Sequence, residues 1–346
     1  MDGRGASADD VLRAVGVRRL LVLAPNWLGD AVMALPALAD VRRGSAAADI
    51  VVAARPSVAA LFSMVPGVSQ VIAGELRGAS WRAASKDASG FDAALVLRNS
   101  FHSALLPWRM GIRERWGYAG DGRSPLLTRA ISRPSGVHQA RYYQQLTEAL
   151  GFPPGPLVSA VHVGGDQRAA ATRVLQDAGW NGTTPLLAVA PGAAYGGAKR
   201  WPARSFAAVA SALARDGATP VIVGSAADGA AGRDLADSLG TGGVASFNLV
   251  GRTDLTTLCG VFALSRGLVS NDSGAMHLAA AVGVPVVAVF GPTDETATHP
   301  IGRAPHAVLT HDVWCRPCML RECPLDHACM TRVAPDAVIS AVRRIA

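Results

Sequence analysis

The fold is decided by residues 21–38, which read Leu21-Val-Leu-Ala-Pro25-Asn-Trp-Leu-Gly-Asp30-Ala-Val-Met-Ala-Leu35-Pro-Ala-Leu38. A short apolar run here leads through a loop into a helix-like segment. The second half of the chain opens in the same way, with Leu187-Ala-Val-Ala-Pro191 before a glycine-rich loop. Short apolar runs that alternate with amphipathic segments are typical of parallel βαβ units. The sequence therefore predicts an α/β protein with two doubly wound domains.

The same alternation continues along the chain from residue 18. In the first half we expect strands at 20–24, 50–53, 70–72 and 93–97, and helices at 28–43, 57–64 and 138–150. In the second half we expect strands at 186–190, 220–224, 267–270 and 286–290, and helices at 203–215, 227–239, 255–265 and 273–282. The arginine-rich stretch that precedes the helix at 138–150 shows a less regular pattern.

A linker candidate lies near the middle of the chain, at Gly151-Phe-Pro-Pro-Gly-Pro156. Its prolines cannot continue a helix, and its glycines permit a sharp change of direction. We therefore predict an N-terminal extension at 1–17, a first domain at 18–165 and a second domain at 166–346. Ligands of doubly wound sheets bind outside the carboxyl ends of the strands, so we expect a cleft between the loops after Pro25 and Pro191.

Composition limits the classes of protein that fit. The chain has 346 residues, 50% of them hydrophobic, which excludes wholesale disorder. Its net charge of +7 is concentrated in residues 1–150, which hold 18 basic and 12 acidic side chains, so the first half should face an anionic partner. The longest apolar stretch, 276–292, is too short and too interrupted for a spanning helix, and no signal peptide is recognised at the N-terminus. We expect a cytoplasmic protein.

One carboxylate stands out in the first domain. Asp30 follows Gly29 at a strand-to-helix turn. A carboxylate in the first turn of a helix is stabilised by the helix dipole, which would make it purely structural. At the carboxyl end of a strand it would also face the cleft, where it could act as a general base. The residues alone leave both interpretations open.

Two loops of the second domain suit a phosphate. Lys199 lies in a glycine-rich loop and is one of only two lysines among 33 basic residues, which favours a role for a compact ammonium group. In Ser270-Asn-Asp-Ser-Gly274, a strand runs directly into a helix, whose first N–H groups could bind phosphate or be capped by Asp272 or Ser273. The fingerprints of dinucleotide-binding proteins and P-loop NTPases are absent. These features together favour a nucleotide-linked donor and a hydroxyl acceptor.

Four of the five cysteines form the pattern Cys315-x2-Cys318-x4-Cys323-x5-Cys329. Thiolates at such spacing suit tetrahedral zinc, which would be structural rather than catalytic. The spacing of the second pair is irregular, however, and free thiols are common in cytosolic proteins. A structural zinc site and a set of free thiols both remain possible interpretations.

Residues 24–38, 191–202, 270–278 and 290–294 together resemble the ADP-heptose:lipopolysaccharide heptosyltransferases of glycosyltransferase family 9. The cysteine pattern resembles heptosyltransferase II in particular. The resemblance covers about residues 18–346. It implies a GT-B fold of two Rossmann-like domains, with the lipid acceptor on the first and ADP-heptose on the second. It also implies inverting transfer that requires no metal ion or other cofactor. By this resemblance Asp30 is the base, Lys199 contacts the phosphates, and Asp272, Ser273 and Gly274 form the loop that touches the donor.

The acceptor in this family is the heptosylated Kdo-lipid A core, an anionic lipid at the inner face of the cytoplasmic membrane. Residues 98–141 hold eight arginines against Glu114 and Asp121, with Phe101, Trp108, Trp116 and Tyr118 interleaved. We expect them to form a peripheral membrane-facing surface, although an ordinary solvated loop is the alternative. Acceptor binding is assigned to five residues of this stretch: Arg113, Arg115, Asn99, Ser100 and His138. No nucleic-acid partner is expected.

Other functions remain open at this point. Heptosyltransferase I and the later-core transferases of the same family differ mainly in their acceptor, and the sequence barely separates them. A nucleotide-sugar-binding module that has lost catalysis would not need an intact Asp30. An NAD-linked oxidoreductase would be expected to carry the glycine fingerprint after its first strand.

Overall fold

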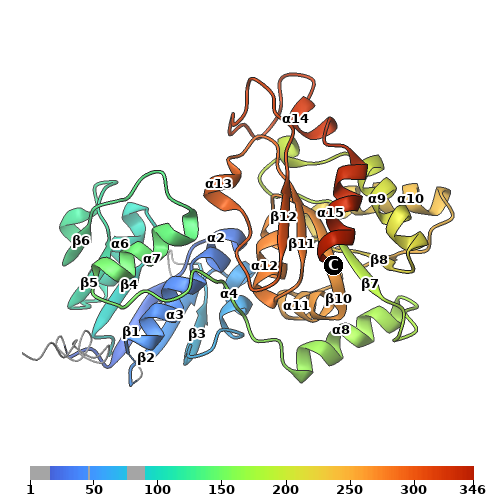
Figure 1. Ribbon diagram of the computed structural model, residues 1–346. Coiled ribbons are helices and arrows are strands. Elements are labelled where there is room, and N and C mark those ends of the chain that lie inside the picture. Colours follow the sequence, from blue (N-terminus) through green and yellow to red (C-terminus); the bar gives the residue numbers. More distant parts are fainter. Residues whose placement is uncertain (1–15, 46, 76–89) are drawn as a thin grey trace, which may run out of the picture. The chain divides into compact units, whose positions relative to one another are not determined.

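The computed structural model describes residues 16–45, 47–75 and 90–346 (Figure 1). The chain forms two compact units, Met1–Val161 and His162–Ala346. The boundary predicted between residues 165 and 166 lies at the start of helix α8 (Gly165–Asp177), a few residues beyond the end of the first unit at Val161. Nearly all of the predicted extension, 1–17, lies outside the described residues.

The first unit contains a parallel six-stranded sheet of order β3-β2-β1-β4-β5-β6. Its strands are β1 (Arg19–Leu23), β2 (Asp49–Ala54), β3 (Gln70–Ala73), β4 (Ala93–Val96), β5 (Glu114–Tyr118) and β6 (Arg129–Ile131). The central strands are apolar and buried, as expected for a sheet covered on both faces. Strand order reverses between β1 and β4, which makes their carboxyl ends the topological switch point where ligands of such sheets bind.

The helices of the first unit are α2 (Leu28–Met33), α3 (Leu35–Arg43), α4 (Pro56–Phe62), α6 (Phe101–Arg109) and α7 (Gln139–Ala149), with a short 3-10 turn at Ser124–Leu126. The single helix predicted over 28–43 is in fact two, α2 and α3. Pro36 has no N–H to donate to the carbonyl of Val32, four residues before it. The hydroxyl of Ser159 donates to that carbonyl instead, at 2.7 Å.

The arginine-rich stretch is more regular than predicted, because it contains α6, β5 and β6. Trp116 and Tyr118 of β5 are 1% and 2% exposed, so they belong to the core. Arg123 is completely buried, and its guanidinium donates to the carbonyls of Tyr118 and Arg98. The prediction that these residues form part of a membrane-facing surface was therefore wrong for Trp116, Tyr118 and Arg123.

The second unit repeats the architecture with a parallel sheet of order β12-β11-β10-β7-β8-β9. Its strands are β7 (Leu186–Ala190), β8 (Thr219–Ile222), β9 (Phe247–Asn248), β10 (Ser265–Asn271), β11 (Val286–Val289) and β12 (His306–Leu309). Here the strand order reverses between β10 and β7, which pair directly. The glycine-rich loop follows β7 and the Asp272 loop follows β10, so the two predicted phosphate loops leave adjacent strands at this switch point.

The helices of the second unit are α8, α9 (Ala203–Arg215), α10 (Gly229–Thr241), α11 (Leu255–Leu264), α12 (Gly274–Val282), α13 (Glu295–Thr298), α14 (Ala328–Thr331) and α15 (Pro335–Ile345), with 3-10 turns at Gly197–Lys199 and Ala226–Asp228. Helix α15 buries Val338 and Val342 and packs against α9 (Figure 1). It thereby fixes the end of the cysteine-bearing segment that precedes it. None of the helices in the described ranges is both long and apolar enough to span a bilayer.

Candidate active site

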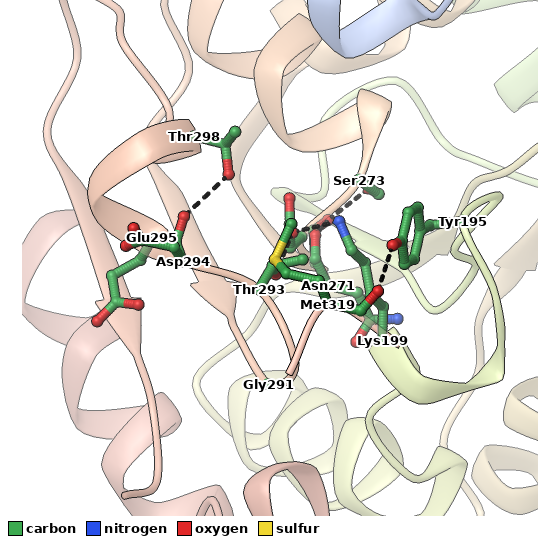
Figure 2. Close-up of polar contacts among 12 residues, drawn as sticks. Tyr195, Lys199, Asn271, Ser273, Gly291, Thr293, Asp294, Glu295, Thr298 and Met319 are labelled. Carbon is green, nitrogen blue, oxygen red and sulfur yellow. Dashed lines mark hydrogen bonds and ion pairs between the residues drawn. The ribbon is translucent and has the colours of Figure 1, made fainter. Parts of the chain in front are cut away.

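Lys199 and Asp272 form an ion pair at the switch point of the second unit (Figure 2). The Nζ of Lys199 lies 2.5 Å from Oδ2 of Asp272, and the two side chains are 13% and 5% exposed. The hydroxyl of Thr293 donates to the same carboxylate oxygen at 2.6 Å. The ammonium also lies 4.6 Å from the centre of the Tyr195 ring. Lys199 is therefore held in one place by a carboxylate and an aromatic face.

This geometry refines the role of Asp272. A carboxylate beside a diphosphate would repel it, whereas a carboxylate beside the lysine fixes the position of the cation. Asp272 therefore positions Lys199, and its assignment to the loop that touches the donor stays a prediction. Thr293 lies within the motif at 290–294, but no pattern in the sequence links its hydroxyl to Asp272.

Asn271 joins the two loops and was also missed as a functional residue. Its side chain is completely buried. Its amide nitrogen donates to the carbonyl of Pro191 at 2.8 Å, and its amide oxygen accepts from the backbone N–H of Trp201 at 2.9 Å. One side chain of β10 therefore binds both ends of the glycine-rich loop that carries Lys199.

Ser273 and Gly274 lie where β10 leads into α12. Ser273 is the N-cap residue of this nine-residue helix, and its side chain makes no capping hydrogen bond. Its hydroxyl lies 3.1 Å from that of Ser270 instead. Capping by Ser273, the structural alternative considered for this loop, is thus not observed in the described chain. The helix N-terminus keeps a positive dipole end close to Lys199, which suits an anion.

In the first unit, Asp30 lies in the first turn of α2, just beyond the carboxyl end of β1. It therefore occupies the switch point of that sheet, as the sequence predicts. Burial mainly, and the charge of Asp30 in addition, raise the pKa of Tyr143 on α7, which places this carboxylate near the Tyr143 ring. Trp27, the N-cap residue of α2, is 60% exposed and offers an apolar surface beside Asp30.

The residues assigned to the acceptor separate into two groups. Asn99 and Ser100 follow β4 at the same edge of the sheet as Asp30, and the Asn99 amide donates to the hydroxyl of Tyr142 at 2.9 Å. His138 is the N-cap residue of α7, where its Nδ1 accepts from the N–H of Ala140 at 3.1 Å. Its ring therefore has a capping role in addition to any contact with an acceptor.

Arg113 and Arg115 lie elsewhere. Arg113 precedes β5 and Arg115 is its second residue, so both are at the amino end of a strand whose carboxyl end faces the switch point. The guanidinium of Arg115 donates to the carbonyls of Ile112, Leu126 and Arg113. The structure does not bring these two arginines together with Asp30, because a parallel sheet separates the two ends of its strands.

The four clustered cysteines line one cavity of about 220 Å³ in the second unit. Cys329 is 7% exposed, and Cys315, Cys318 and Cys323 are partly exposed. Burial first, and then the neighbouring thiols, raise the pKa of Cys329. Within the described ranges, no three side chains of His, Cys, Asp or Glu are arranged to hold a metal ion.

Comparisons with known proteins agree with this arrangement. A family model described as Glycosyltransferase family 9 (heptosyltransferase) matches residues 85–329. The chain is 31% identical over 300 residues to Lipopolysaccharide heptosyltransferase 2 of Escherichia coli K12, which covers 82% of this chain and 85% of that protein. The solved structure of E. coli ADP-heptose LPS heptosyltransferase II matches with a TM-score of 0.77 and 27% identity, over 94% of this chain and 98% of the other.

A second solved structure, the glycosyl transferase family 9 protein of Veillonella parvula DSM 2008, matches with a TM-score of 0.81 over 94% of this chain and 96% of that chain. Its identity of 21% shows the fold alone. The predicted fold class, an α/β protein of GT-B type, is confirmed, and so are the resemblance and the assignment as a glycosyltransferase. The chain belongs to glycosyltransferase family 9, the heptosyltransferase family.

Proposed function

We propose that this protein transfers a heptose from ADP-L-glycero-D-manno-heptose to the heptosylated Kdo-lipid A core of lipopolysaccharide, as a heptosyltransferase II. The observation that carries the proposal is the buried Lys199–Asp272 pair beside the N-terminus of α12. A fixed cation and a helix dipole on one switch point suit the two phosphates of a nucleotide-sugar donor. The relatives named heptosyltransferase 2 support the choice of heptose and of this acceptor.

In this proposal the first unit binds the acceptor and the second unit binds the donor. Asp30 accepts the proton of the acceptor hydroxyl while that oxygen attacks the anomeric carbon, and ADP leaves from the opposite face with inversion. Negative charge grows on the leaving diphosphate. Lys199 and the first N–H groups of α12, at Ser273 and Gly274, stabilise that charge, which is most effective where water is excluded. The reaction needs no metal ion for this chemistry.

The acceptor is expected at the carboxyl edge of the first sheet, where Asn99 and Ser100 accompany Asp30. Arg113 and Arg115 are better suited to a different role at the opposite edge. Trp108 is 51% exposed at the end of α6, and Arg109 and Arg113 are exposed next to it in the chain. An exposed tryptophan flanked by arginines suits the interface of an anionic membrane, so we propose peripheral association with the inner face of the cytoplasmic membrane through these residues.

We further propose that the four clustered cysteines hold a structural metal ion such as zinc. The support is their chemistry, because four thiols that line one cavity can supply a complete tetrahedral ligand set. The thiols would have to converge for this, since they are not arranged as ligands in the described structure. Metal analysis of the purified protein should find about one equivalent, and serine at all four positions should remove it. Less than a tenth of an equivalent after purification in zinc-containing medium would refute the site.

The donor class is tested by thermal melts with four ligands: ADP-heptose, ADP, a UDP-sugar and NAD. A ligand that binds only the native state raises the melting temperature, so ADP-heptose and ADP should raise it and the other two should not. Stabilisation by NAD alone would favour an oxidoreductase. Truncated core acceptors then separate heptosyltransferase II from heptosyltransferase I and later-core enzymes, since only the heptosylated core should be extended.

A further inference from the structure

The cysteine segment, residues 315–329, is hydrogen-bonded to the loop that carries Lys199. The two backbone groups of Ala198 are both used: its N–H donates to the carbonyl of Arg321 at 2.9 Å, and its carbonyl lies 2.7 Å from Nε2 of His327. The N–H of Gly197 donates to the Glu322 carboxylate at 2.9 Å. The residue next to Lys199 is therefore fixed from both sides by the cysteine segment.

Two further contacts connect the segment to the residues around the ammonium group. The hydroxyl of Tyr195, whose ring faces Lys199, donates to the carbonyl of Met319 at 2.6 Å (Figure 2). The N–H of Met319 donates to the carbonyl of Pro292 at 2.9 Å, in the loop that carries Thr293. One residue of the cysteine segment thus bridges the Lys199 loop and the loop that binds Asp272.

Arg316 strengthens the second of these links. Its side chain is 10% exposed, and its guanidinium donates to the carbonyl of Gly291 at 2.7 Å and to the carboxylate of Glu295 at 2.5 Å. These contacts hold the loop between β11 and α13 on both sides of Thr293. The cysteine segment therefore helps to position Lys199 and the two groups that hold it, the Tyr195 ring and the Asp272 carboxylate.

The glycines of the Lys199 loop serve this contact. A Cβ atom on Gly196 would lie 2.3 Å from the carbonyl oxygen of Arg321, and one on Gly197 would lie 2.5 Å from the Glu322 carboxylate. Any side chain at either position would push the cysteine segment away. A glycine-rich loop beside a lysine suggests close approach of a phosphate, and at Gly196 and Gly197 the structure shows close approach of the cysteine segment.

Backbone strain marks the same contact points. Three described residues other than glycine have a left-handed backbone, and two of them are Met319 (φ 56°) and His327 (φ 57°). Bulky side chains rarely adopt this conformation, and they keep it only where the surroundings hold them. Both residues bind the donor-side loops through the groups described above. The strain therefore coincides with the two places where the segment makes contact.

We propose that the cysteine segment is a positioning element of the donor site, in which Glu322 and His327 hold Lys199 where it binds the diphosphate. The proposal rests on the proposed function, because it assumes that Lys199 binds the donor. It extends that function by giving the cysteine-rich region a task in donor affinity that is separate from any metal it holds. Glu322 and His327 are positioning residues, since they act through Lys199.

The test compares the variants Glu322→Ala and His327→Ala with the control Asp326→Asn. Asp326 belongs to the same segment, but its carboxylate accepts from Ala328 and pairs with the exposed Arg332 rather than with the Lys199 loop. Loss of one such hydrogen bond should weaken ADP binding, measured by calorimetry, by about tenfold in each alanine variant. KM for ADP-heptose should rise and KM for the acceptor should stay unchanged. His327→Gln, which keeps an N–H donor, should recover most of the affinity.

A second measurement uses the unmodified protein. Coupling between two sites is reciprocal, so if the segment favours ADP binding then ADP must favour the ordered segment. Saturating ADP should slow hydrogen–deuterium exchange of the backbone amides of residues 315–329 several-fold, whether or not the thiols hold a metal. Equal ADP affinity in wild type and both alanine variants, or exchange rates in residues 315–329 that are indifferent to ADP, would overturn the inference and leave the proposed function intact. Failure of wild-type protein to bind ADP would refute the proposed function itself.

Discussion

The Lys199–Asp272 pair allows the structural and ligand-binding roles of Lys199 to be separated. In the wild-type protein, the side chains of Lys199 and Thr293 both donate to the Asp272 carboxylate. In Lys199→Met this carboxylate stays almost completely buried but keeps only the hydrogen bond from Thr293. Removing one partner of a buried ion pair costs about 3–5 kcal/mol, and the partial exposure of Lys199 favours the lower end. For a unit of this size, about 3 kcal/mol lowers the melting temperature by roughly 6–12 °C.

The double variant Lys199→Met, Asp272→Asn removes the uncompensated charge as well. Its free energy of unfolding should return to within about 1 kcal/mol of the wild-type value, since no buried ion is left without a partner. ADP affinity should nevertheless remain low in both variants, because the cation is missing. Differential scanning calorimetry and isothermal titration measure the two quantities on the same samples. Recovery of ADP binding along with stability would refute the role of Lys199 as the phosphate contact.

Three other outcomes follow from particular contacts. Ser159→Ala leaves the buried carbonyl of Val32 without its donor and should lower the free energy of unfolding, measured in urea, by about 1–3 kcal/mol. An unchanged midpoint of urea unfolding would contradict the role of Ser159 at the break between α2 and α3. Burial raises the pKa of Cys259 to about 12, so this thiol should resist iodoacetamide at pH 8, and rapid labelling detected by mass spectrometry would contradict its burial. Because this folded pKa exceeds the ordinary 9.0, the free energy of unfolding should fall as pH rises above 9. Arg109→Gln with Arg113→Gln should weaken binding to anionic vesicles at low salt, whereas the exposed Arg204→Gln should not, and equal effects would show nonspecific attraction.

Because Lys199 lies in the glycine-rich loop and Lys86, the other lysine, does not, the sequence predicts that Lys199→Ala weakens ADP-heptose binding and that Lys86→Ala does not. Lys86 lies outside the described residues, so its surroundings give no structural basis for that control. The double variant at Lys199 and Asp272 replaces it with a control taken from the same ion pair.

Sequence patterns predicted best where one physical cause dominates. Strand β7 is apolar at each of its five positions and buried throughout, and α9 begins after Pro202 and runs to Arg215 as its periodicity predicts. The loops after β1, β7 and β10 were placed correctly because parallel strands end at one edge of a sheet. That rule accounts for the positions of Asp30, Lys199 and Asp272, whereas the roles expected for them rest on the family resemblance.

The failures have physical reasons too. Strand β5, Glu114–Tyr118, has an arginine at its second position, and arginine is normally a surface residue; here the guanidinium of Arg115 is satisfied by backbone carbonyls that no local pattern indicates. Helix α8 buries only Ala171 and Leu175, so its apolar periodicity is weak. The contacts of Glu322 and His327 with the Lys199 loop span more than 120 residues, a distance at which a single sequence carries no signal.

In the proposed reaction the protein transfers heptose, with Asp30 as the base that accepts the proton of the acceptor hydroxyl. Its most direct test is mass spectrometry of a truncated, heptosylated core acceptor after incubation with ADP-heptose. Wild-type protein should add the mass of one heptose. Asp30→Asn should bind ADP normally but turn over more slowly by about 100-fold or more, the scale of lost general-base catalysis. An acceptor whose mass stays unchanged with wild-type protein, or equal turnover by Asp30→Asn, would contradict the account.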